Sequence, residues 1–340
     1  MGTRLLPLLG LTLLALGLLR FEATAAEAPP PAFAAVLREA EALAPLETLI
    51  VARDGEILVE KAFRGHSTRQ PTNIKSASKA IISALVGIAI DKGLLEGTEQ
   101  KIAPLLDDKL PRDPDPRLGE ITIGNLLSMQ AGLGRTSGPN YGRWVASRDW
   151  VRAALARPFA GEPGGGMLYS TGNSHLLSAI LTRQSGRSTL ALARDWLAPV
   201  EGFAIGDWMR DPQGIYFGGN QMAMSPRSLL AFGELYRNKG RAGSVQVLPA
   251  DWIAESWTPR TQSVFHDDLY GYGWFLTEMS GERVAYAWGY GGQMIYVAPE
   301  LALTVVMTSA ENRASARTGH RDALHRLMRG IVAAVKAEQP

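Results

Sequence analysis

The chain has 340 residues, which is enough for one large domain or two closely joined lobes. Hydrophobic residues make up 46% of it and charged residues 20%, as is typical of a globular protein. The formal net charge of +2 is close to neutral and no basic stretch carries interleaved aromatic residues, so we expect no nucleic-acid partner.

The N-terminus has the pattern of a secretory signal peptide. Arg4 precedes an apolar stretch over residues 5–19, and Ala23-Thr24-Ala25 has the small residues of a cleavage site. We therefore expect a periplasmic or secreted protein with no stable membrane anchor once residues 1–25 are removed; an uncleaved anchor is the alternative. The chain contains no cysteine, which excludes disulfides, thiol nucleophiles and cysteine-bound zinc.

The first part of the remaining chain is predicted to form a helix and a β-hairpin. Residues 26–44 are interpreted as a linker followed by a helix that Pro45 ends. Residues 46–52 and 57–63 are rich in apolar and β-branched residues, which predicts two strands joined at Asp54-Gly55.

The middle of the chain is predicted to be mainly helical and its end to return to strands. Helices are expected over residues 121–129, 150–155, 174–184, 189–197 and 225–238, and around Trp252, with residues 240–270 otherwise in loops. Strands are expected over residues 284–288, 294–297 and 303–307, and a closing helix over 320–334.

This order of elements predicts an α+β fold. An antiparallel sheet would be built from both chain ends with flanking helices, and a mainly helical lobe over about residues 95–275 would be inserted into it. We expect residues 45–335 to form a single domain.

Ser76 and Lys79 are the first candidate catalytic residues. A polar lead-in changes at Lys79 into a long apolar run, which predicts the N-terminus of a buried helix. Residues three apart lie one turn apart on the same face, so an amine would lie beside a hydroxyl that needs a base to become nucleophilic. Burial and the helix dipole would both disfavour the ammonium. The alternative is a helix-capping serine with a surface lysine.

Two further stretches carry candidate residues. Tyr169-Ser170-Thr171 follows a Gly/Pro-rich approach over residues 161–166, and Asn173 comes two residues later. Trp288 and Gly289 end a predicted strand before Tyr290 and two more glycines. Tyr169 could also be an ordinary buried aromatic, and the glycines could simply allow a tight strand entry.

In this order the motifs resemble those of the β-lactamase-related serine hydrolases. That superfamily includes class C β-lactamases, penicillin-binding DD-peptidases, esterases and 6-aminohexanoate-dimer hydrolases. The resemblance extends over about residues 45–330. Its three motifs are Ser76-Ala77-Ser78-Lys79, Tyr169-Ser170-Thr171 and Ala287-Trp288-Gly289. It implies a serine β-lactamase or DD-peptidase-like fold.

The resemblance also implies a mechanism without a metal or organic cofactor. Ser76 would attack a carbonyl, Lys79 would accept its proton, and Tyr169 would relay that proton to the leaving group. The oxyanion would lie between the backbone N–H groups of Ser76 and Tyr290. The oxyanion and substrate region would include Trp288, Gly289, Tyr290 and Asn173.

Two departures from the family pattern weigh against β-lactam hydrolysis. Thr171 stands where the family carries asparagine, and Ala287 supplies no cation for a substrate carboxylate. Asn173 could replace the missing amide or cap the next helix. The aromatic residues Tyr141, Trp144 and Trp288 could line an acyl pocket or lid, or pack in the core.

We therefore predict a serine hydrolase that cleaves a small amide or ester substrate. The alternatives are a β-lactamase or DD-peptidase and, from another class, a non-catalytic cell-wall peptide-binding protein. An α/β-hydrolase is excluded because the stretch Gly172-Asn173-Ser174-His175-Leu176 lacks the closing glycine of the nucleophile elbow. The five histidines show no metal-ligand spacing, so we expect no metal site.

Overall fold

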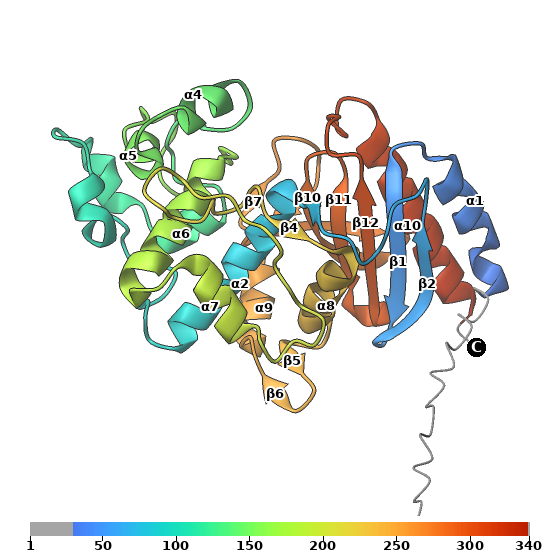
Figure 1. Cartoon of the computed structure of the whole chain (residues 1–340). Coiled ribbons are helices and arrows are strands. Elements are labelled where there is room, and N and C mark those ends of the chain that lie inside the picture. The colour runs from blue at the N-terminus through green and yellow to red at the C-terminus, as the bar shows by residue number, and fades with distance from the viewer. Residues whose placement is uncertain (1–29, 339–340) are drawn as a thin grey trace, which may run out of the picture.

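The computed structural model describes residues 30–338, so the predicted signal peptide lies outside the described residues. Figure 1 shows a part built around a β-sheet, which contains both ends of the described chain, beside a mainly helical part formed by its middle. This arrangement confirms the predicted α+β fold, with a sheet from both chain ends and an inserted helical region.

The sheet part has eight antiparallel strands in the order β2-β1-β12-β11-β10-β9-β8-β7. The strands in this order are β2 (Glu56–Ala62), β1 (Leu46–Arg53), β12 (Leu303–Ser309), β11 (Gln293–Ala298), β10 (Glu282–Gly289), β9 (Phe275–Met279), β8 (Leu269–Tyr270) and β7 (Thr261–Gln262). The predicted hairpin pairs β1 with β2, and β1 also pairs with β12, with Ile50 opposite Val306.

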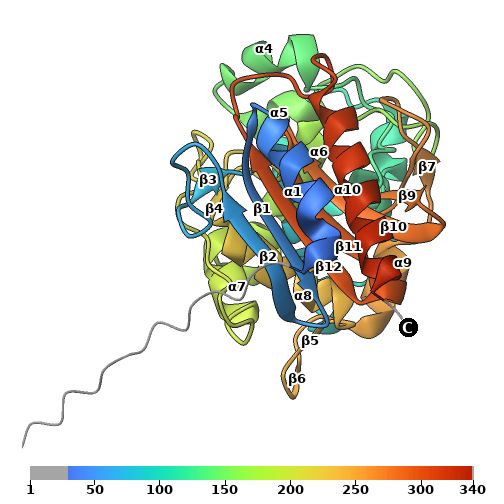
Figure 2. The same ribbon diagram turned by 90° about the vertical axis from the view of Figure 1, so that its right-hand side faces the viewer.

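Both faces of the sheet are covered by helices. Because side chains alternate along a strand, Leu49 and Val51 of β1 enter one apolar cluster and Ile50 and Ala52 enter the other. Figure 2 shows α1 (Ala34–Ala42) and α10 (His320–Ala337), which contact each other, in front of the sheet. The helix α8 (Pro226–Arg237) packs against β11 and β12, so the central strands are apolar on both faces.

The remaining helices form the inserted part and its junction with the sheet. These helices are α2 (Ser78–Asp91), α3 (Ile123–Leu127), α4 (Tyr141–Val145), α5 (Trp150–Leu155), α6 (Thr171–Ser185), α7 (Thr189–Trp196) and α9 (Ala250–Ser256). Every residue of α2 from 78 to 89 is buried, and this helix contacts α6, α7 and β10. The run that begins at Lys79 is therefore the helix that joins the two parts.

Short strands account for most of the differences from the prediction. Residues 240–270, predicted as loops around one helix, contain β7 and β8 of the main sheet and the hairpin of β5 (Arg241–Ala242) and β6 (Val245–Gln246). A further pair joins β3 (Thr72–Asn73) to β4 (Ala223–Met224). Strands of two residues are too short to show an alternating pattern. Two strands of the main sheet, β7 and β8, therefore lie within the range 95–275 that was predicted as the helical lobe.

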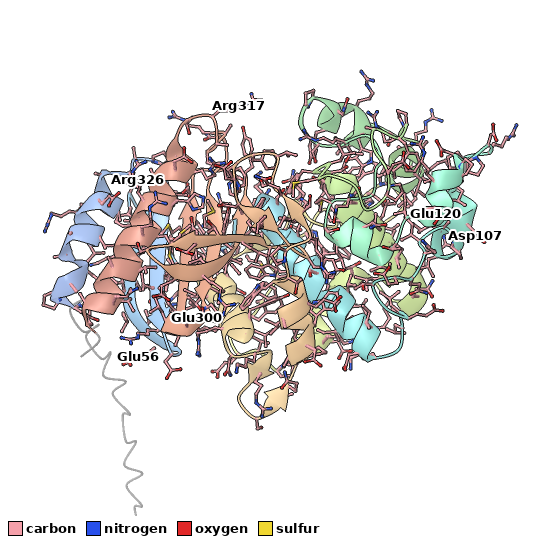
Figure 3. All side chains as sticks on the ribbon, turned by 180° about the vertical axis from the view of Figure 1, so that it is seen from behind. Glu56, Asp107, Glu120, Glu300, Arg317 and Arg326 are labelled. Carbon is pink, nitrogen blue, oxygen red and sulfur yellow. The ribbon has the colours of Figure 1, made fainter. Side chains whose placement is uncertain are left out.

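Charged side chains lie on the outside of both parts. Figure 3 labels Glu56 and Arg326 on the sheet part and Asp107 and Glu120 on the helical part, all of them exposed. Within residues 30–338, no helix has both the length and the apolar character that crossing a membrane requires.

Gly87 of α2 provides a test of this packing. A Cβ atom at this position would lie 2.4 Å from the ring of Trp252, so we expect Gly87→Ala to overpack the junction and to lower the free energy of unfolding by about 1–3 kcal/mol. Gly330 of α10 is the matched control, because its Cβ would meet Val36 at 3.6 Å. Gly330→Ala should raise stability by about 0.5–1 kcal/mol. Urea unfolding measures the free energy of unfolding of both variants. An equal change in Gly87→Ala and Gly330→Ala would contradict the packing argument.

Candidate active site

Ser76 lies in a tight turn immediately before α2. Lys75 is the first residue of this turn, η2 (Lys75–Ala77), and its φ of 51° is in the left-handed region that non-glycine residues rarely adopt. Two contacts hold this conformation: the Lys75 N–H donates to Asn73 Oδ1 at 3.0 Å, and Lys75 Nζ pairs with Glu311 at 2.8 Å. Ser76 itself remains partly exposed, so a substrate can reach its hydroxyl.

Lys79 is buried and lies beside the Ser76 hydroxyl. Its Nζ is 2.9 Å from Ser76 Oγ, 2.7 Å from the carbonyl oxygen of Gly219 and 3.5 Å from Thr171 Oγ1. Burial lowers the pKa of Lys79 to about 7, because the ammonium loses its hydration. A large fraction of this amine is therefore neutral near pH 7, with a lone pair that can accept a proton.

Tyr169 packs against the same amine. Its ring centroid is 5.1 Å from Lys79 Nζ, and the side chain is buried. Burial raises the pKa of Tyr169 to about 12, although a hydrogen bond with Ser76 and the positive charge of Arg135 act in the opposite direction. The phenol is therefore protonated at neutral pH, which suits a proton donor, whereas Lys79 suits the base.

A loop that the sequence did not single out holds the backbone around Tyr169. Arg135 Nε donates to the Tyr169 carbonyl at 2.9 Å. The Thr136 N–H donates to Ser170 Oγ at 3.0 Å, and the Thr171 N–H donates to Ser137 Oγ at 2.8 Å. These contacts fix Thr171, so that its hydroxyl, in place of the expected amide, faces Lys79.

The end of β10 passes directly beside the turn that carries Ser76. A Cβ at Gly289 would lie 2.1 Å from the carbonyl oxygen of Ile74, so only glycine permits this approach. Gly292, with φ of 112°, belongs to the tight turn that leads into β11. The side chain of Tyr290 is half exposed. The glycines therefore serve the backbone and, by doing so, bring the predicted oxyanion strand to Ser76.

Asn173 is close in sequence to Tyr169 and Thr171, but its side chain forms no hydrogen bond with the candidate catalytic residues. It is buried in the first turn of α6, and its side chain makes no hydrogen bond to any residue within 30–338. Ser170 is the N-cap residue of α6, so the suggestion that Asn173 caps the helix is wrong.

The aromatic candidates divide between the core and the margin of the site. Trp144 is core: it is buried, and its Nε1 donates to the Trp150 carbonyl at 2.9 Å. Trp288 is partly exposed, and its ring packs edge-on with Phe265 at 5.6 Å between centroids. Phe265, which the sequence did not indicate, also packs edge-on with Tyr169 at 5.1 Å. Its isolated place in a polar loop gives no signal from sequence alone.

The third aromatic candidate, Tyr141, approaches the site from the helical part. Its hydroxyl accepts a hydrogen bond from Asn220 Nδ2 at 3.2 Å, and Asn220 follows the glycine whose carbonyl contacts Lys79.

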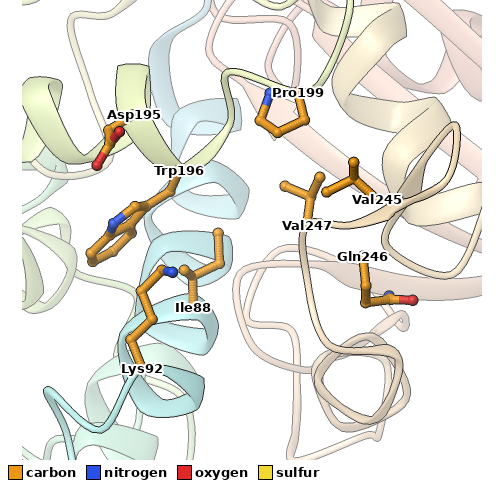
Figure 4. A pocket seen from close by; sticks show the side chains of 8 residues that line it. All are labelled: Ile88, Lys92, Asp195, Trp196, Pro199, Val245, Gln246 and Val247. Carbon is orange, nitrogen blue, oxygen red and sulfur yellow. The ribbon is translucent and has the colours of Figure 1, made fainter.

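A surface hollow of about 270 Å³ lies elsewhere, between α2, α7 and the β5–β6 hairpin (Figure 4). Its lining includes Ile88, Lys92, Trp196 and Val247, and none of the predicted catalytic residues. Among residues 30–338, no group of three His, Asp or Glu side chains is placed to hold a metal ion.

Solved structures with this fold are numerous. A protein from Bacillus anthracis assigned as a 6-aminohexanoate-dimer hydrolase superposes with a TM-score of 0.72 at 18% identity, covering 89% of this chain and 82% of that one. A penicillin-binding protein homologue from Caulobacter crescentus has a TM-score of 0.71 at 17% identity, covering 90% and 98%. A D-stereospecific amidohydrolase from Streptomyces has a TM-score of 0.65 at 17% identity, covering 82% and 94%.

These likenesses show the fold: it is that of β-lactamase-like proteins and penicillin-binding protein homologues. The profile of the Beta-lactamase family matches residues 39–327, and the chain belongs to that family. The predicted resemblance is thereby confirmed. No curated protein matches the chain by sequence.

The buried amine of Lys79 predicts a stability that depends on pH. Its pKa of about 7 in the folded protein lies below the value of about 10.4 in an unfolded chain, so between these values the unfolded state binds more protons and stability rises with pH. The penalty for burying the ammonium is fully present below pH 7. Lys79→Met should therefore be more stable than the parent at pH 6, and this advantage should fall by about 1.4 kcal/mol per unit between pH 7 and 10.

Urea unfolding at several pH values measures this difference. Lys101→Met, at an exposed lysine paired with Glu120, is the control and should show a small difference at every pH. An advantage of Lys79→Met that did not change with pH would show that the amine is not destabilised by burial.

Proposed function

We propose that this protein is an exported serine hydrolase that cleaves a small amide or ester through an acyl-enzyme on Ser76. The observation that supports this most directly is the 2.9 Å separation between Lys79 Nζ and Ser76 Oγ, with the pKa of the amine lowered to about 7 by burial. A neutral amine at this distance can take the serine proton as the hydroxyl attacks. Export rests on the signal-peptide pattern of residues 1–25.

The proposed reaction uses only these side chains and water. Ser76 Oγ forms a bond to the substrate carbonyl carbon while its proton passes to Lys79 Nζ. The phenol of Tyr169 then donates its proton to the leaving nitrogen or oxygen, the scissile bond breaks, and Tyr169 regains a proton from Lys79. Water then adds to the carbonyl carbon of the Ser76 ester. The bond between this carbon and Ser76 Oγ breaks, which releases the carboxylic acid and restores the serine hydroxyl.

Backbone donors would stabilise the oxyanion. We assign this role to the N–H groups of Ser76 and Tyr290, since donors fixed in advance contribute most to such stabilisation. The close approach of Gly289 to Ile74 supports this assignment, because it holds the end of β10 against the turn of Ser76. Trp288 would border the substrate beside this strand.

The surroundings of the site favour an uncharged amide or ester over a β-lactam or a peptide carboxylate. Ala287 is buried within β10, where it faces Ile295 across the sheet, and it offers no cation. The site margin instead carries the aromatic rings of Phe265, which is 37% exposed, and of Trp288, which is partly exposed and packs edge-on with it. An apolar group next to the scissile carbonyl would gain from contact with them.

Labelling of Ser76 tests the proposal against a non-catalytic binding role. Incubation with a fluorophosphonate should add one adduct, seen by intact mass, because an activated serine attacks the reagent. Ser76→Ala should not be labelled. Ser83→Ala, which removes a buried hydroxyl of the same helix that has no hydrogen-bond partner among residues 30–338, should be labelled like the parent. An unlabelled but folded parent protein would favour the binding role.

Phe265 tests the preference for apolar substrates. We expect Phe265→Ala to lower kcat/KM for a p-nitrophenyl octanoate about tenfold more than for the acetate, because only the longer chain reaches the ring. Val245→Ala, at an exposed side chain that lines the separate hollow of Figure 4, is the matched control and should leave the ratio unchanged. If both esters lost activity equally, Phe265 would have no part in substrate selection.

A further inference from the structure

The carbonyl group of Gly219 determines how the Lys79 amine is oriented. A neutral amine has two N–H donors and one lone pair, and a carbonyl oxygen can only accept. The Gly219 carbonyl oxygen accepts one N–H at 2.7 Å, and Thr171 Oγ1, 3.5 Å away, can accept the second. The lone pair is then left for the Ser76 hydroxyl. Anything that fixes Gly219 therefore fixes the direction in which Lys79 accepts a proton.

The segment of Gly218 and Gly219 fits against the start of α6 only because it lacks side chains. A Cβ at Gly218 would lie 2.1 Å from the Ser174 carbonyl oxygen, and a Cβ at Gly219 would lie 2.6 Å from Lys79 Cγ. Ser174 Oγ donates to the Gly218 carbonyl at 3.0 Å. The N–H of Gly218, which belongs to the preceding peptide group, donates to Nδ1 of His175 at 3.4 Å.

His175 is in turn paired with Asp211. Their side chains are fully buried, and His175 Nε2 is 3.0 Å from Asp211 Oδ2. The other carboxylate oxygen, Oδ1, accepts from the N–H groups of Gln213 at 2.8 Å and Ile215 at 2.9 Å. These two donors fix the orientation of the carboxylate, so Oδ2 is left to accept the Nε2 proton of His175.

We propose that His175 and Asp211 are positioning residues for the general base, acting through the Gly218–Gly219 segment on Lys79. This inference rests on the proposed function, in which Lys79 accepts the Ser76 proton. Asp211 selects the histidine tautomer with hydrogen on Nε2, as a carboxylate does for an imidazole elsewhere. The unprotonated Nδ1 then accepts from Gly218, and the Gly219 carbonyl is held toward Lys79.

The competing explanation is a polar pair that serves only the core. His175 lies among Trp144, Trp150 and Phe217, with ring centroids 5.5–5.8 Å away, so its loss would also reduce packing. The test must therefore use a variant that keeps the shape of the side chain, and a measurement that reports on Lys79.

Asp211→Asn is that variant. An asparagine cannot accept from His175 Nε2 and also accept from the two backbone N–H groups, because it has one oxygen. With its NH₂ group toward the ring, it forces the hydrogen onto Nδ1, where it opposes the Gly218 N–H. Ser178→Ala is the matched control: Ser178 is buried one turn further along α6, and its Oγ donates to the Tyr216 carbonyl at 2.7 Å in the same neighbouring segment.

The measurement is the rate of Ser76 labelling by a fluorophosphonate from pH 5 to 9. For the parent we expect a rise with a midpoint near 7, the pKa of Lys79. In Asp211→Asn the plateau should fall about ten- to a hundredfold, because the base is misplaced. Its midpoint should move to lower pH, since the ammonium loses the Gly219 acceptor. The other titratable groups nearby, Tyr169 and Arg135, are unchanged.

The outcomes separate the alternatives. General loosening would admit water and move the midpoint upward, toward the ordinary pKa of lysine, so an upward shift overturns the inference. Equal rates in Asp211→Asn and the parent, or equal losses in Asp211→Asn and Ser178→Ala, also overturn it. A parent protein that is not labelled overturns the proposed function itself. Nitrogen-15 NMR of the parent provides a check without mutation, and a His175 protonated on Nδ1 would overturn the inference.

Discussion

The burial of the Lys79 amine beside the Ser76 hydroxyl is the constraint on which the rest of the structure depends. A buried ammonium is costly, and the side chain can remain at this position only if its nitrogen finds oxygen partners and can lose its proton. Both conditions require contributions from distant segments, because Thr171 lies 92 residues along the chain and Gly219 lies 140 residues along it. The junction of the sheet part and the helical part is where these segments meet, and α2 lies at that junction.

Several features around this amine lower the stability of the folded protein. Lys75 holds a left-handed conformation directly before Ser76, and no ion pair to Lys79 is present within residues 30–338. Strain of this kind persists only where the surroundings impose it. Here Asn73 and Glu311 impose it on Lys75, whereas the tight packing of β10 against Ile74 prevents the turn from relaxing.

The sequence was sufficient for the elements with strong patterns and for the residues within motifs. The apolar run after Lys79 predicted α2, and the stretches rich in apolar and β-branched residues near both ends of the chain predicted most of the main strands. Spacing together with the family resemblance indicated Ser76, Lys79 and Tyr169, and the structure brings these three together. The partners of these residues could not be predicted in the same way. Gly219 acts through a backbone carbonyl, which no residue type reveals, and Phe265 reaches Tyr169 from a loop 96 residues later in the sequence.

The two departures from the family pattern have different consequences on the proposed function. Thr171 keeps an oxygen near Lys79 and can still accept an N–H, so the base retains its orientation without the amide. Ala287 has no such substitute, and a substrate carboxylate would have no cation on β10 to bind. Recognition would then depend on contact with exposed apolar side chains such as Phe265. Apolar contacts discriminate weakly, by about 10–200-fold for one methylene group, whereas charged contacts discriminate strongly. Such a site would accept a range of amides and esters of similar size. Its substrates would be selected more by the bond that Ser76 attacks than by the apolar contacts that bind them.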